Sequence, residues 1–132
     1  MEKKVFPSMD QWLKEAKAQP DAGQVGMYLV HNGTVRETAK ALVRSGAADT
    51  KPVTGMVFSY DSEKLEKVVE EARALEGIYY IRVWLNEGKL DVCDDIMYVL
   101  IGGDIRPHVV DALQALLDEL KFICVKEQEH YE

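Results

Sequence analysis

Four cationic side chains stand at places where the sequence predicts the ends of helices or strands. Arg36 follows a strand predicted for residues 25–31, and Arg106 begins the last predicted helix. Lys121 and Lys126 lie around the end of that helix and in the closing segment. Because element ends and loops are where a rigid scaffold presents reactive groups, these cations are where the chain is expected to hold an anion.

Each cation also has a simpler structural explanation. A lysine in the last turn of a helix, such as Lys121, complements the negative end of the helix dipole. Arg36 and Arg106 would most simply be exposed side chains of a loop and a helix start. Arg106 fits this explanation poorly, because a positive charge is unfavourable at the positive end of a helix. An anion bound between its guanidinium and the backbone N–H groups would account for it.

The overall charge narrows the choice of anion. The chain has 132 residues, with 16 Lys and Arg against 23 Asp and Glu, a net charge of −7, and a pI near 5.0. No basic run is present, so the sequence argues against nucleic acid as a partner. Any anion that the chain binds must therefore be held by a local cluster of cations on an acidic protein.

Several other classes of function lack their motifs. Gly-rich phosphate loops, zinc-protease helices and nucleophile elbows are absent, and Cys93 and Cys124 have no spacing that would close a metal site. We expect no metal, no bound cofactor and two buried cysteines. His31 and His108 lack ligand-spaced partners and are expected to be ordinary. No apolar segment approaches the roughly 18 residues of a membrane span, and no secretory signal is visible, so the cytoplasm is the simplest location.

The hydrophobic pattern predicts one domain over residues 1–132, and 47% hydrophobic residues allow a real core. Helical and strand periodicities follow one another in the order α-β-β-α-β-β-α-β, which predicts an α+β fold with helices on one face of a mainly antiparallel sheet. Residues 34–43 offer a further helix start, residues 45–52 a mobile surface loop, and residues 126–132 a fraying tail. The predicted helices are residues 8–16, 61–75 and 107–120, and the predicted strands are residues 25–31, 53–60, 78–85, 90–92 with 96–101, and 122–125.

The order of these residues resembles the catalytic, or large, subunit of molybdopterin synthase, the MoaE family. The strand and turn from Gly26 to Arg36 are similar to its G-x(6)-G-x-V-R segment. Residues 60–65 and 71–73 resemble the family's second helix, and residues 88–90 resemble its G-x-L element. Arg106, Lys121 and then Lys126-Glu127, which looks like the end of a W-K-K-E signature, follow in the family's order.

This resemblance implies an α/β hammerhead fold and a homodimer of large subunits within a heterotetramer. The implied small subunit is a ubiquitin-like carrier whose C-terminal Gly-Gly tail enters the large subunit. Its thiocarboxylate delivers sulfur to cyclic pyranopterin monophosphate, which forms the dithiolene of molybdopterin. Carried over to this chain, the resemblance implies that Lys121 is catalytic with help from Lys126, and that Arg36, Arg106 and Glu127 bind substrate. The implied ligand is a small anion with a single phosphate, so Arg36, Arg106, Lys121 and Lys126 are expected to converge in one basic pocket.

The chain also departs from the family pattern. Leu85-Asn86 stands in place of a His-Arg pair, Ile105 stands in place of a second histidine, and the closing segment before Lys126-Glu127 is shorter. These changes remove groups that bind and orient substrate. Two hypotheses follow: a sulfur-transferring synthase subunit with an altered site, or a MoaE-like dimeric scaffold that binds without transferring sulfur.

Overall fold

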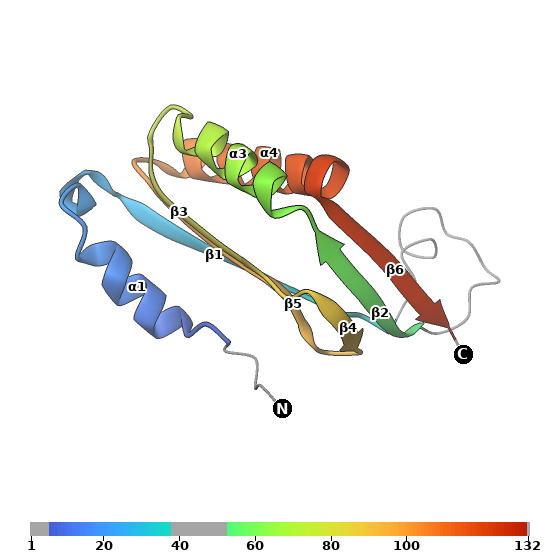
Figure 1. The fold of residues 1–132 in the computed structure, drawn as a ribbon. Helices are drawn as coiled ribbons and strands as arrows, with labels where there is room; N and C mark the ends of the chain where they lie inside the picture. Colours follow the sequence, from blue (N-terminus) through green and yellow to red (C-terminus); the bar gives the residue numbers. More distant parts are fainter. Residues whose placement is uncertain (1–5, 38–52, 132) are drawn as a thin grey trace.

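The computed structural model describes residues 6–37 and 53–131, which form three α-helices and six strands (Figure 1). A 3-10 turn at Ala22–Gln24 precedes the first strand, and a π-helical turn at Leu120–Cys124 precedes the last. The main elements, in chain order, are α1 (Met9–Lys17), β1 (Met27–Thr34), β2 (Val53–Tyr60), α3 (Ser62–Arg73), β3 (Ile78–Leu85), β4 (Gly88–Asp91), β5 (Asp95–Gly103), α4 (Arg106–Glu119) and β6 (Val125–Tyr131).

The described strands form two antiparallel sheets. β5 lies between β1 and β3 in the first sheet, and β2 lies between β4 and β6 in the second. Met27 stands opposite Gly103 and Thr34 opposite Asp95, so β1 and β5 pair along their whole length. The predicted α+β class with mainly antiparallel pairing is confirmed, although two sheets take the place of one.

Helices cover both faces of the first sheet, and the prediction of helices on one face is wrong. α3 and α4 lie together on one face, whereas α1 lies on the other (Figure 1). Val99 and Ile101 of β5 pack with α3 and α4, while Leu100 between them packs with α1. Successive strand side chains point to opposite faces, so a run of apolar residues in β5 needs cover on both.

α1 is held on its face by an aromatic and an ionic contact. Ser8 caps the helix by accepting a hydrogen bond from the Gln11 N–H at 3.3 Å. Trp12, one turn further along, is buried against the sheet. The Arg82 guanidinium of β3 lies 4.5 Å from the centroid of the Trp12 ring and pairs with Glu15. These contacts close the face of the sheet that α3 and α4 leave open.

The second sheet has its own apolar cluster. Phe58 of β2 is fully buried, with Leu90 of β4 and Leu85 of β3 among the residues around it. Asn86, between β3 and β4, is a buried polar side chain whose Nδ2 donates to the Asp95 carbonyl oxygen at 2.8 Å. Because a buried amide needs such a partner, this bond ties the β3–β4 turn to the start of β5.

The C-terminal segment differs from its prediction. A π-helical turn at Leu120–Cys124 occupies most of the residues 122–125 for which the sequence predicts a strand. β6 instead spans Val125–Tyr131, where the sequence predicts a fraying tail, and it pairs with β2. Residues 126–130 are polar and carry no alternating apolar signal, so pairing with β2 rather than hydrophobic patterning specifies this strand.

Cys93 is also placed differently from its prediction. It is exposed and its backbone φ is 75°, in the left-handed region, because it turns the chain between β4 and β5. The side chain of Cys124 lies outside the described residues. So do most of the helix start expected at residues 34–43 and the whole loop expected at 45–52, while Thr34 ends β1 and residues 35–37 are not helical.

Candidate functional site

Arg36 lies two residues beyond the end of β1 with its side chain exposed. The register of β1 shifts just after Gly33, and irregularities of this kind redirect the side chains that follow. Val35 is buried, and its N–H donates to the Asp94 carbonyl oxygen at 2.9 Å. The Val35 carbonyl oxygen accepts from the Cys93 N–H at 2.7 Å. The β4–β5 turn therefore anchors the backbone beside Arg36.

Arg106 is the first residue of α4, and its side chain is also exposed. The N-cap residue, Ile105, makes no side-chain capping bond, and the first turn contains no acidic residue. Within residues 6–37 and 53–131, the Arg106 side chain has no ion-pair or hydrogen-bond partner. A cation without a partner thus stands at the positive end of a helix, which is the position where an anion is favoured.

Lys121 follows α4 within the π-helical turn, and its side chain is partly exposed. Its Nζ lies 5.8 Å from the centroid of the Phe122 ring, a side chain that is 81% exposed. Lys126 and Glu127 belong to β6, where their backbones pair near the end of β2. Their side chains lie outside the description, so the structure places only their backbone.

A single chain does not bring the two arginines together, so the predicted convergence is wrong for one chain taken alone. Arg36 lies beyond the Thr34 end of β1, whereas Arg106 follows Gly103, which is opposite the Met27 end. Strand β1 has 8 residues. At about 3.3 Å per residue, its length alone separates the two arginines by roughly 26 Å.

Lys121 is separated from both arginines. Arg106 and Lys121 lie at opposite ends of α4, whose 14 residues span about 21 Å in a regular helix. The residue after Arg36, Glu37, accepts a hydrogen bond from the Val53 N–H at 2.7 Å at the start of β2. Lys121 instead leads into β6, which begins opposite the end of β2 (Figure 1). The predicted site residues therefore occupy three separate places in one chain.

A hydrogen-bonded pair that the sequence analysis missed lies beside Arg106. His108 Nδ1 is 2.7 Å from Asp104 Oδ1, and the same oxygen accepts the Ile105 N–H at 2.6 Å. The hydrogen bond from His108 lowers the pKa of Asp104, and the bond to Asp104 raises the pKa of His108. An acid and a histidine four residues apart, on either side of a helix start, are the signal that could have indicated this pair.

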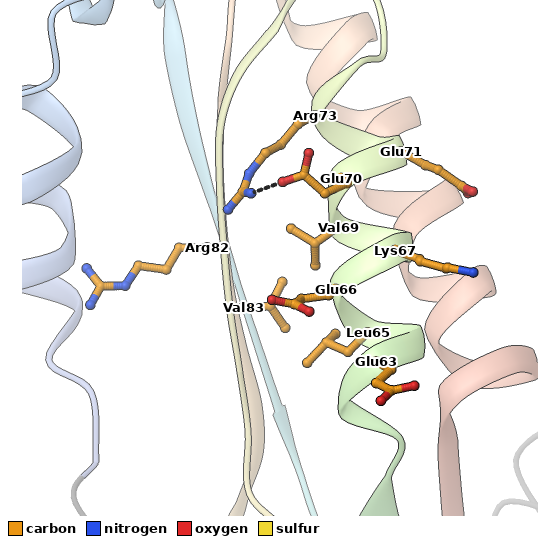
Figure 2. Close-up of a pocket in the computed structure, with 10 residues that line it drawn as sticks. All are labelled: Glu63, Leu65, Glu66, Lys67, Val69, Glu70, Glu71, Arg73, Arg82 and Val83. Carbon is orange, nitrogen blue, oxygen red and sulfur yellow. Dashed lines mark hydrogen bonds and ion pairs between the residues drawn. The ribbon is translucent and has the colours of Figure 1, made fainter.

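A groove of about 860 Å³ lies between α3 and β3 (Figure 2). Leu65 and Val69 of α3 and Val83 of β3 supply its apolar lining. Glu70 and Arg73 also line it and pair with each other at 2.8 Å. None of the predicted site residues that the structure describes lines this groove, so the groove lies apart from the positions of the predicted site cations.

Residues 6–37 and 53–131 contain neither a cluster of metal-ligating side chains nor a membrane-spanning helix. No three His, Cys, Asp or Glu side chains there are placed to hold one metal ion. No helix in the same part of the chain is long and apolar enough to cross a membrane.

Comparison with known proteins places the chain in a family. The family model described as MoaE protein matches residues 7–122. The solved structure of molybdopterin synthase from Staphylococcus aureus has 16% sequence identity, covers 97% of this chain and 88% of that chain, and has a TM-score of 0.71. The molybdopterin biosynthesis MoaE protein from Burkholderia ambifaria has 19% identity, covers 96% and 83% respectively, and has a TM-score of 0.69.

A third similar structure is the complex of subunits 1 and 2 of molybdopterin-converting factor from Helicobacter pylori. It has 14% identity, covers 96% of this chain and 80% of that chain, and has a TM-score of 0.65. The TM-scores of these three structures show that they share the fold of this chain, and at such low sequence identity they show the fold alone. They confirm the predicted fold class. No curated protein sequence matches the chain significantly. Because the family model spans most of its residues, the chain belongs to the MoaE family of molybdenum cofactor biosynthesis proteins.

Proposed function

We propose that this chain is the large subunit of a molybdopterin synthase, which transfers sulfur from a thiocarboxylated ubiquitin-like carrier to cyclic pyranopterin monophosphate. Family membership supports the proposal, as does the similar fold of the two-subunit complex from Helicobacter pylori. The single observation that carries it is Arg106, an exposed cation without a partner among the described residues, at the positive end of α4. The phosphate of such a substrate is the type of group that this position favours.

The separation of the arginines supports a site built from two chains. β1 is an edge strand, so no described strand pairs with its outer side. Antiparallel pairing with β1 of a second chain, about a two-fold axis at the middle of the strand near Val30, would close this edge. Arg36 would then lie opposite Val25 of the partner subunit. Val25 precedes Gly26, whose N–H bonds to the Gly103 carbonyl oxygen at 2.8 Å, next to the turn that leads to Arg106.

Each predicted site residue has a role at this junction. Arg36 and the partner subunit's Arg106 clamp the phosphate through paired hydrogen bonds. Lys121 acts on the carrier's thiocarboxylate in one of two ways. It moves a proton, or its neutral amine bonds to the acyl carbon while the C–S bond breaks and the sulfur passes to the substrate, and water then hydrolyses the acyl–lysine bond to release the carrier's carboxylate. Lys126 assists Lys121, and Glu127 contacts the substrate. Lys121 and Arg36 of one site come from the same chain, and the partner subunit supplies Arg106.

A second candidate function is a MoaE-like dimeric scaffold that binds the carrier without sulfur transfer. Ile105 favours it, because this residue stands where the resemblance implies a histidine, is 51% exposed and offers a substrate no hydrogen bond. Such a scaffold would keep the fold and the dimer but lack part of the chemistry.

Incubation of the purified protein with thiocarboxylated carrier and cyclic pyranopterin monophosphate distinguishes the two functions. The synthase forms dithiolene product, and Lys121→Ala is expected to slow this at least about 100-fold with no change in circular dichroism or Tm. Lys64→Ala, at an exposed position of α3, is the matched control and should keep wild-type turnover. Carrier binding without product over many hours would establish the scaffold instead, and failure to bind any Gly-Gly-tailed carrier would contradict both functions.

A further inference from the structure

Asp104 and His108 join three segments at the base of α4. His108 Nδ1 lies 2.7 Å from Asp104 Oδ1, and that oxygen accepts the Ile105 N–H at 2.6 Å. The Asp104 N–H donates to the Gly77 carbonyl oxygen at 2.9 Å. The Asp104 carboxylate thus bonds to the N-cap residue and the first turn of α4, while the Asp104 backbone N–H ties the end of β5 to the turn between α3 and β3.

Gly77 makes this close approach possible. Its φ is +78°, in the region that disfavours residues with a side chain. A Cβ at this position would clash with both the Asp104 carboxylate and His108 Nδ1. The two side chains therefore pack directly against the backbone of the turn, which restricts their conformations.

The pair takes the place of the capping bond that α4 lacks. In a capping box, the third residue of a helix reaches back to the N-cap residue, whose side chain bonds in return. His108 is the third residue of α4, but the N-cap residue, Ile105, has no polar side chain. His108 bonds instead to Asp104, whose carboxylate accepts the Ile105 N–H. These bonds fix the backbone that leads into Arg106, while the Arg106 side chain stays exposed.

We propose that Asp104 and His108 are positioning residues for Arg106, because they fix the first turn of α4 so that its guanidinium meets the substrate anion in one orientation. The identity of that anion rests on the proposed function. His108 acts through Arg106 and does not contact substrate, because Nδ1 faces Asp104 and Nε2 faces Glu76 at 3.9 Å. It therefore does not replace the histidine that the resemblance implies at Ile105.

This arrangement makes the positioning of Arg106 dependent on pH. The charged groups that act on His108 are Asp104, Glu76 from the α3–β3 turn and Asp111 from α4, and all are acidic. The bond to Asp104 is the largest cause that raises the pKa of His108 above its ordinary value of 6.5. Below the raised pKa the imidazolium donates a charge-assisted bond, and as the pH rises through it that charge is lost and the bond weakens. Affinity for the anion should fall over the same pH range.

Steady-state kinetics from about pH 5 to about pH 9 measure this effect. His108→Ala is expected to raise KM for cyclic pyranopterin monophosphate about tenfold, while kcat falls less than about twofold. His108→Asn keeps an amide donor near the position of Nδ1, so its KM should stay low and should not rise with pH. Gln114→Ala, an exposed truncation on the same helix, is the control for general effects on α4.

A double substitution tests whether His108 acts through Arg106. In an Arg106→Ala background, His108→Ala should leave KM unchanged, because the group that it positions is already gone. If the two substitutions raise KM by independent factors, or if His108→Ala alone leaves KM unchanged, the proposal is overturned.

Backbone ¹⁵N relaxation gives a readout that does not require turnover. The order parameter of the Arg106 amide should be about 0.85 in the wild type and in His108→Asn, and below about 0.6 in His108→Ala. Equal values in all three proteins would refute the positioning role, whatever the activity. If the order parameters follow this expectation but the wild-type protein forms no dithiolene, the proposed function is rejected and the positioning role is retained.

Discussion

Arg106 differs in its surroundings from two other arginines of the chain. Arg73 pairs with Glu70 at 2.8 Å, and Arg82 pairs with Glu15, so both guanidinium groups are already engaged within the fold. Arg106 has no such partner among the described residues and stands where the helix dipole also attracts negative charge. A phosphate can bind there without first breaking an internal ion pair, which makes Arg106 the residue best suited to recognise an anion.

Gly77→Ala tests the close packing of Asp104 and His108 against the turn beside Arg106. A Cβ at Gly77 would clash with Asp104 and His108, and its φ of +78° disfavours alanine. The substitution should therefore lower the free energy of unfolding by about 1–3 kcal/mol, measured by urea denaturation. Gly23→Ala is the matched control, because nothing lies within 4 Å of a Cβ at that position. If the two variants are equally stable, the packing around Gly77 tolerates a methyl group and the prediction is wrong.

At the scale of elements, local patterning accounts for most of the fold. The predicted strands at residues 53–60 and 78–85 coincide with β2 and β3, because each is apolar and bounded by turn residues. β6 was missed because its residues are polar and only its pairing with the distant β2 defines it. The two covered faces of the first sheet were also not predictable, because periodicity shows that α1 has an apolar side but not which face of a sheet it meets.

The proposed dimer depends on the outer edge of β1, with which no described strand pairs. Val30, at the middle of this strand, is 41% exposed. Val30→Asp would place a carboxylate on each chain near the two-fold axis, where like charges repel and charged edges resist pairing. We expect light scattering after size exclusion to show a monomer at micromolar concentration, with helical circular dichroism retained and turnover lost.

Val110→Asp provides the matched control for this change. Val110 is 43% exposed and belongs to α4 rather than to the edge strand β1, so the variant should remain a dimer. If Val30→Asp is also dimeric, the interface lies elsewhere and the two-fold pairing of β1 is excluded.

On the scale of the whole molecule, a chain with a net charge of −7 presents its predicted site cations in three places. A long polyanion would meet overall repulsion, whereas a small anion needs only one local group of cations. A symmetric pairing about β1 creates two such groups, each with Arg36 from one chain and Arg106 from the other. The candidate residues were predictable from their positions at element ends. Their distribution was not, because linear order does not show which ends meet or whether a second chain completes the site.

Mixed dimers of Arg106→Ala and Lys121→Ala chains test this two-chain site most directly. Each variant alone should keep only a low residual turnover, far below a quarter of the wild-type value, because every site in its dimer lacks one group. In a mixed dimer, one site combines the intact Lys121 of one chain with the intact Arg106 of the other, while the second site lacks both. Random exchange of equal amounts should therefore restore about a quarter of wild-type turnover. If Arg106 acts within its own chain, no intact site can form, and turnover that stays at the level of the single variants would contradict the two-chain site.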